Sequence, residues 1–167
     1  MVSRESGLLD EIKSNFKIDG RVQRERRIYI SIEEQDLIRL CKWIKKRGYI
    51  HLSAMSITDW LDKGKNEITY HVWSYEDKIL ITIKTKIDRS YLKIKSVSSI
   101  WHENAQIHER ELFEMFGIKF EGNQDLTPLF LEEWSGPPPF RKDFNWREYV
   151  TSEFYSRENE RELAYYD

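Results

Sequence analysis

The sequence has little of the chemistry by which catalytic and metal-binding chains are usually recognised. Cys41 is the only cysteine among 167 residues, so no internal disulfide can form. One thiolate cannot by itself hold an iron–sulfur cluster or a thiolate zinc site. The sequence also contains no GxGxxG, P-loop, GxSxG or CxxC motif. These absences favour a chain with no catalytic residues and no cofactor-binding residues of its own.

Long apolar runs and an excess of one charge are absent as well. No run approaches the roughly 20 apolar residues of a membrane-spanning helix, and the N-terminus lacks the apolar stretch of a signal peptide. The 27 basic and 29 acidic residues nearly balance, which gives no general attraction to nucleic acid. The basic run at Arg21, Arg24, Arg26 and Arg27 is typical of a solvated strand edge. We therefore expect a cytoplasmic chain that binds no nucleic acid and does not insert into the membrane.

The four histidines do not have the spacing of metal ligands. His102 to Gln106 resembles the first four positions of a zinc-binding HExxH helix, but the fifth residue is glutamine. His108 to Leu112 fails in the same way, with leucine at the fifth position. His51 and His71 fall on expected strands without companion ligands. We therefore expect no metal site in this chain.

Hydrophobic residues make up 40% of the chain, and their spacing predicts an α+β fold. Helices are expected at 5–17, between a start at 31–34 and a cap at Gly48, and at about 104–116, and strands at 28–32, 49–58, 67–75 and 78–87. A capping box at Ser31 to Glu34 is expected to open the second helix, and Cys41 lies on its apolar stripe. In the last strand Ile81 and Ile83 face one side and Thr82 and Lys84 the other. This alternation predicts an antiparallel, mixed-edge sheet with helices on one face. The domain is expected at 1–120, followed by an extended C-terminal arm at 121–167.

The helix before the arm, and the arm itself, break the usual patterns. Glu109 lies on the apolar stripe of the helix, where a carboxylate must be paired or at a wet boundary. Arg110 and Glu114 are spaced to pair along the surface, and Gly117 is expected to end the helix. The arm is interrupted by glycines and prolines, yet it carries large apolar residues, namely Leu126, Leu129, Phe130, Leu131, Trp134 and Phe140. Such a segment either packs against its own domain or docks onto a partner. Residues 145–167 are expected to form a loosely held helix.

Two blocks in series, HERELFEMFGIKFEGNQDL at 108–126 and PPPFRKDF at 137–144, resemble the 30 kDa subunit, also known as the C subunit, of respiratory complex I (NADH:quinone oxidoreductase). The resemblance covers about residues 47–146. The matching positions are Glu109, Arg110 and Glu111, Met115 to Ile118, Phe120, Gly122, Asp125, Leu126, and Arg141 to Phe144. The sequence departs from the family at Glu114, Asn123 and Phe140, where aspartate, histidine and a Pro-Leu pair are common. The same subunit type occurs in membrane-bound hydrogenases and in ferredoxin- or F420-linked relatives.

The resemblance implies an accessory subunit in the hydrophilic arm of an ion-translocating membrane complex, on the cytoplasmic side of the membrane. Its expected partners are a large subunit related to [NiFe]-hydrogenases and a small iron–sulfur subunit, which it would position for electron transfer. Iron–sulfur clusters, and nickel–iron in the hydrogenase relatives, would belong to those partners. The interface residues implied are Glu109, Arg110, Glu111, Phe116, Gly117, Asp125, Phe140, Arg141, Lys142, Asp143 and Phe144.

Several alternatives remain open at this level. The charged residues at 109–111 would either pair across the interface or fix the C-terminal arm. Arg141 and Asp143 would either contact charged groups of a partner or tie the arm to its own domain, through Glu109 or Glu111. Rival functions are a stand-alone module that captures peptides with the arm, and a hydrolase built on paired carboxylates of the Glu-rich helix. The electron donor, the acceptor and the translocated ion are properties of other subunits.

Overall fold

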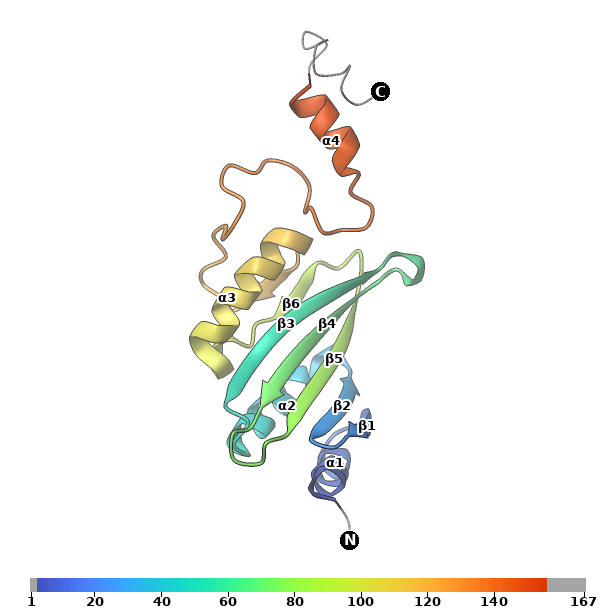
Figure 1. Cartoon of the computed structure of the whole chain (residues 1–167), viewed down its shortest axis with the longest axis vertical. Helices are drawn as coiled ribbons and strands as arrows, with labels where there is room; N and C mark the ends of the chain where they lie inside the picture. Colours follow the sequence, from blue (N-terminus) through green and yellow to red (C-terminus); the bar gives the residue numbers. More distant parts are fainter. Residues whose placement is uncertain (1–2, 156–167) are drawn as a thin grey trace.

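The structure is a computed structural model that describes residues 3–155 of the chain, as a mixed sheet with helices packed on it (Figure 1). The predicted α+β class is confirmed. In chain order the elements are α1 (Arg4–Asn15), β1 (Ile18–Arg24), β2 (Arg27–Ile32), α2 (Glu34–Lys46), β3 (His51–Trp60), the short 3-10 helix η1 (Leu61–Lys63), β4 (Lys65–Trp73), β5 (Leu80–Asp88), β6 (Lys93–Lys95), α3 (Ser98–Phe116), β7 (Lys119–Glu121) and α4 (Trp146–Glu153).

The main sheet has five strands in the order β1-β2-β5-β4-β3. Three of its pairings are antiparallel, and β2 pairs with β5 in parallel. This parallel pairing lies inside the sheet, whereas the sequence suggested that any mixed pairing would lie at an edge. The reason is that α2 carries the chain from β2 across the sheet, so that the β3–β4 hairpin is built outward and β5 returns beside β2. The separate strands β6 and β7 form a small parallel pair.

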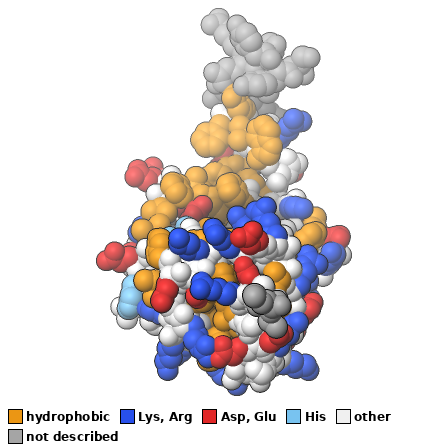
Figure 2. Space-filling model, turned by 60° about the horizontal axis from the view of Figure 1, so that its bottom comes forward, with side chains coloured by type: hydrophobic (Ala, Val, Ile, Leu, Met, Phe, Trp, Pro, Cys, Tyr) orange, Lys and Arg blue, Asp and Glu red, His pale blue; other side chains and the backbone are white. Residues whose placement is uncertain are grey.

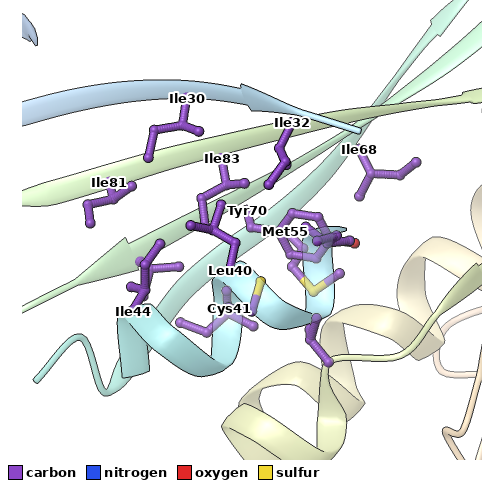
Figure 3. Packing of buried hydrophobic residues seen from close by; sticks show 14 of the residues in the cluster. Ile30, Ile32, Leu40, Cys41, Ile44, Met55, Ile68, Tyr70, Ile81 and Ile83 are labelled. Atoms are coloured by element: carbon purple, nitrogen blue, oxygen red, sulfur yellow. The ribbon is translucent and has the colours of Figure 1, made fainter. Parts of the chain in front are cut away.

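The helices pack against one apolar face of the sheet. Ile28 pairs with Ile81 and Ile30 with Ile83, and all four side chains are almost fully buried. α2 places Leu40, Cys41 and Ile44 beneath them (Figure 3), and Cys41 is fully buried as the sequence predicted. The opposite face carries polar side chains such as Lys84, which bonds to Glu67 across the sheet. The period of two in the strands therefore sets which face holds the core.

The N-terminal elements differ from the expectation in two places. β1 was not predicted, and it pairs antiparallel with β2, so that the arginine run falls on this edge hairpin. The predicted capping box does not form, because Ser31 stays in β2 and Glu33 is the N-cap of α2 without a side-chain bond. Pairing in the sheet thus takes precedence over the local capping preference.

α3 begins at Ser98, earlier than predicted, and it is kinked at Trp101 and His102. His102 has φ 41° and ψ −124°, a strained combination for a residue with a side chain. Gly117, at φ 75°, ends the helix as predicted. Beyond β7, the only helix within the described part of the C-terminal segment is α4. It covers the beginning of the helix predicted at 145–167; residues 156–167 lie outside the described residues.

The C-terminal arm runs over the end of the sheet and leads to α4, at the opposite end of the molecule from α1 (Figure 1). Its described part, residues 121–155, is called "the arm" from here on. None of the helices between residues 3 and 155 is long and apolar enough to cross a membrane.

Candidate partner-binding site on the C-terminal arm

Arg110, on α3, holds the first part of the arm through its backbone. Its guanidinium donates to the carbonyl oxygens of Thr127 and Pro128 at 3.0 and 3.1 Å. It also lies 3.7 Å from the Asp125 carboxylate. An irregular segment cannot satisfy its own carbonyl groups, so a forked donor such as arginine can serve two of them at once.

Glu114, one turn further along α3, supplies the complementary acceptor. Its carboxylate accepts from the backbone N–H groups of Leu129, Phe130 and Leu131, at 3.1, 3.1 and 2.6 Å. The Arg110–Glu114 pair predicted from their spacing is therefore wrong, because both side chains turn to the arm. Together they fix residues 127–131 to the helix.

Glu109 is fully buried between α3, the chain before it and the start of the arm. Its carboxylate accepts from Ser96 Oγ and Val97 N–H, both at 2.7 Å, and from Asn123 Nδ2 at 2.9 Å. Burial raises the pKa of this carboxyl group, and the three donors partly oppose that rise. Of the two roles considered for Glu109, its contacts fit fixing the arm rather than pairing across an interface.

A second set of contacts holds the arm near Asp143. Arg89, which follows β5, bonds to the Asp59 carboxylate at 2.7 and 3.0 Å and to the Asp143 carboxylate at 2.7 Å. Arg141 lies 3.2 Å from Asp143, and the Lys142 N–H donates to Asp59 at 3.0 Å. Hydrogen bonds from Arg89, followed by those from Arg141, hold the pKa of Asp143 well below its usual range. Arg89 likewise lowers the pKa of Asp59.

One alternative drawn from the sequence was that Arg141 and Asp143 reach their own domain through Glu109 or Glu111. Asp143 does reach the domain, but through Arg89, whereas the side chain of Arg141 bonds to Asp143 within the arm. The backbone of Lys142 adds a bond to Asp59, and sequence reasoning missed both Arg89 and Asp59. A signal for Asp59 was available. It follows Met55 and Ile57 in the alternation of β3, so it lies on the core side, where a carboxylate needs a cation. Arg89 carries no such periodic signal.

The arm also leaves large aromatic side chains exposed. Phe140 packs edge-on against Phe116 with ring centres 5.8 Å apart, yet it is 58% exposed. Near it, Pro138 lies so close to Gly117 that an added Cβ would be 2.9 Å from the proline ring. Further along, Trp134, Phe144 and Tyr149 form a small cluster with centres 4.9 to 6.0 Å apart.

Exposed side chains of this kind gather on one side of the molecule. Figure 2 shows hydrophobic side chains concentrated above the charged body of the molecule. The large hydrophobic side chains that the arm leaves exposed are Phe130, Phe140, Trp146 and Phe154, each 58% to 67% exposed. A concentration of exposed apolar side chains is typical of a protein-binding site.

The interface residues implied by the resemblance are thus arranged in three ways. Glu109, Arg110, Asp125, Arg141 and Asp143 make the contacts that hold the arm in place. Phe116, Gly117, Phe140 and Phe144 form its apolar packing. Glu111 lies beside His108, and the Lys142 side chain is exposed. Their contact with a partner stays a prediction. Between residues 3 and 155, no three His, Cys, Asp or Glu side chains are grouped to hold a metal ion.

Comparison with known proteins gives a consistent result. Residues 30–150 match the family described as respiratory-chain NADH dehydrogenase, 30 kDa subunit. The C subunit of the F420H2 dehydrogenase of Methanosarcina mazei is 31% identical over 128 residues, covering 75% of this chain and 80% of that protein. The C subunit of the NADH-quinone oxidoreductase of Moorella thermoacetica is 30% identical over 111 residues, covering 66% of this chain and 74% of that protein.

Two solved structures share the fold. A chain of the membrane-bound sulfane sulfur reductase, an archaeal respiratory membrane complex, matches with a TM-score of 0.82 and 23% identity, covering 94% of this chain and 95% of that one. A trypsin-resistant fragment of Nqo5 matches with a TM-score of 0.63 and 19% identity, covering 74% of this chain and 100% of the fragment.

Proposed function

Because the chain belongs to the family of the 30 kDa subunit of respiratory-chain NADH dehydrogenase, we propose that it is an accessory subunit that positions the electron-transferring subunits of a membrane complex. Membership of this family makes the chain a subunit of a complex I-like or related respiratory membrane complex. We propose further that it holds a large [NiFe]-hydrogenase-like subunit and a small iron–sulfur subunit in place. It would do so as a peripheral subunit on the cytoplasmic side of the membrane.

The observation that carries this proposal is the ordered but uncovered arm. The arm is fixed to the domain by Arg110, Glu114, Arg89 and Asp59, yet it leaves aromatic side chains in solvent. A segment fixed in this way loses little conformational freedom when it binds, which favours its use as a docking surface. The match to a chain of a respiratory complex covers 94% of this chain, whereas residues 1–120 are only 120 of its 167 residues. The structural match therefore includes part of the arm as well as the sheet domain.

The proposed mechanism is architectural. No reaction step takes place on this chain. The domain and the arm would instead fix the distance between the terminal iron–sulfur cluster and the site of electron delivery, both carried by partner subunits. Because electron transfer rates fall steeply with distance, a subunit that only sets this geometry affects turnover without touching the substrate.

The first experiment is purification of the tagged full-length chain from native membranes in mild detergent, with mass spectrometry and metal analysis. We expect a large hydrogenase-like subunit, an iron–sulfur subunit and membrane subunits to co-purify. Nickel in the preparation would indicate a membrane-bound hydrogenase, and its absence alongside the same partners would indicate a quinone-, F420- or sulfur-linked relative. Purification of this chain alone would contradict the proposal and favour a stand-alone binding module.

Two variants refine this experiment. Arg141→Ala and Asp143→Ala loosen the arm, so we expect several-fold less partner protein to co-purify while the isolated chain remains folded. Lys13→Ala, on the exposed surface of α1 at the other end of the molecule, is the matched control and is expected to assemble normally. If the isolated Arg141→Ala and Asp143→Ala chains lose thermal stability to the same extent as they lose partner binding, these residues serve the fold and not the interface.

A further inference from the structure

A groove runs along the outer edge of β3, between that strand and the arm. Its volume is about 430 Å³, and its lining consists of Ile57, Thr58, Asp59, Phe116, Phe140 and Lys142. Ile57 and Thr58 are successive residues of a strand, so their side chains point to opposite faces of the sheet. A groove that touches both must therefore lie along the edge of the strand rather than on one face.

The backbone of β3 is unpaired on this side. β3 is the last strand of the sheet and pairs only with β4. Asn104 Nδ2 donates to the Leu52 carbonyl near the start of β3. From Met55 to Trp60, no backbone hydrogen bond other than those to β4 is found within residues 3–155. An open strand edge of this kind can accept a further extended segment.

The charges around the groove favour an acidic occupant. The guanidinium groups of Arg89 and Arg141 bind the carboxylates of Asp59 and Asp143, and Lys142 contributes only its backbone N–H to Asp59. Both arginines are paired with these carboxylates, and Asp59 is already saturated by Arg89 and the Lys142 N–H. Lys142 is an exposed residue that lines the groove, and its side chain forms no ion pair within residues 3–155. The lining therefore includes one positive charge that is not paired.

Another part of the groove's lining is apolar, at Phe116 and Phe140. Phe140 is held by its N–H bond to the Met115 carbonyl at 3.0 Å and by its packing on Phe116, so its ring has a fixed position. More than half of that residue's surface is nevertheless exposed, at 58%. A fixed but exposed aromatic ring beside an open strand edge can receive one large apolar side chain with little rearrangement.

We propose that this groove binds an extended segment of a partner subunit, which pairs with the outer edge of β3, places one large apolar side chain against Phe116 and Phe140, and directs a carboxylate to Lys142. The inference rests on the proposed function, since the partner is another subunit of the same complex. It adds the chemistry of the segment that is bound: an extended strand with an apolar residue and, within about two residues of it, an Asp or Glu.

The sequence allows a direct test by cross-linking. Cys41 is fully buried, so Thr58→Cys provides a single accessible thiol in the groove. This variant is labelled with benzophenone maleimide, added to membranes from cells that lack the native chain, and irradiated. Asp19→Cys, on the opposite edge strand β1, is the control. We expect the Thr58 label to cross-link to one partner peptide that contains the acidic and apolar pair, and the Asp19 label not to reach that peptide.

A charge reversal provides a second readout that does not depend on the label. Lys142→Glu is expected to reduce co-purifying partner protein about tenfold, because like charges then face each other, whereas Lys142→Arg retains it. If the unmodified chain assembles, but the Thr58 label yields no such peptide and Lys142→Glu assembles normally, the inference is wrong and the proposed function stands. If the unmodified chain itself fails to enter a complex, the proposed function is wrong.

Discussion

The sheet domain and the arm are held together by different forces. Every residue that is buried in the described chain lies at or before Phe120, and its buried hydrophobic residues, apart from Met115, form one continuous cluster. The arm contributes none of them. It is held by the side chains of Arg110 and Glu114 and by the Asp59–Arg89–Asp143 contacts. Burial therefore determines the domain, whereas a few polar contacts, open to competition from water, determine where the arm lies.

This difference implies that the two regions can be disturbed separately. A cavity in the core should lower the stability of the whole chain, since the domain carries nearly all of the buried apolar surface. Loss of an arm contact should release the arm and leave the domain folded. The expected effects decrease from the core, through the arm contacts, to the titration of single carboxylates.

The largest effect is expected for Leu40→Ala. Leu40 is fully buried between α2 and the sheet, and its truncation leaves a cavity (Figure 3). We expect the free energy of unfolding to fall by about 2–5 kcal/mol, measured by urea denaturation of the purified chain. Ile50→Ala is the control, because Ile50 is 61% exposed, and its effect should stay within about 0.5 kcal/mol. Equal effects of the two variants would contradict a core centred on this cluster.

A smaller and local effect is expected for Glu114→Ala. Its removal leaves three backbone N–H groups of the arm without their acceptor. Hydrogen bonds to charged groups contribute about 1.5–3 kcal/mol, and partial exposure favours the lower end, so exchange at 129–131 should become roughly tenfold faster. Hydrogen-exchange mass spectrometry measures this change, while the urea midpoint of the domain should barely move.

Glu111→Ala is the matched control for this variant. Glu111 lies on the same helix, and among the described residues its carboxylate is close only to the His108 ring, at 3.9 Å. Its replacement should leave exchange in the arm unchanged. If both variants accelerate exchange equally, the arm is held by the general charge of α3 rather than by the specific contacts of Glu114.

The smallest effect is a pair of titrations with opposite directions. The pKa of Asp59 is lowered chiefly by Arg89, so its stabilising contribution is complete above the ordinary aspartate value of about 3.9 and is lost as the pH falls through the lowered pKa. The pKa of Glu109 is raised by burial, so the folded state gains from protonation, and this gain is lost as the pH rises through the raised pKa.

Two backbone amides report these titrations directly. The Lys142 N–H donates to Asp59 and the Val97 N–H donates to Glu109. In amide NMR spectra recorded from pH 7 to pH 2, we expect the Val97 signal to shift with a midpoint above about 4.3, and the Lys142 signal only below about 3.9. A common midpoint for both signals would contradict the lowered pKa of Asp59 and the raised pKa of Glu109.

The same difference explains what could be predicted from the sequence. The helices and most strands followed from hydrophobic periodicity, which records burial, so the α+β class and the buried position of Cys41 were predictable. β1 lacks a clean alternation, since Gly20 and several charged residues interrupt it, and it was missed. The position of the arm could not be predicted from a period, because Glu114 and Arg110 act on backbone groups that no residue pattern marks.

The candidate site was predictable only in part. Resemblance to the family brought out Glu109 and Arg141 to Phe144, but not Asp59 and Arg89, to which the arm is tied. These two residues are distant from the arm in sequence and meet it only after the sheet has formed. The alternation of β3 marks Asp59 as a carboxylate that needs a cation, but no spacing in the sequence identifies Arg89 as that cation, because the contact depends on the tertiary fold.

The parallel pairing of β2 with β5 has a consequence for the order of folding. β3, β4 and β5 are joined by short connections and can form from neighbours in the chain, as can the β1–β2 hairpin. Within residues 3–155, the ladder between these two halves joins Ile28 to Ile81 and its neighbours, and it requires closure of the whole intervening segment. Contacts between distant parts of a chain form slowly, so we expect the docking of these two halves, with α2 between them, to limit the folding rate.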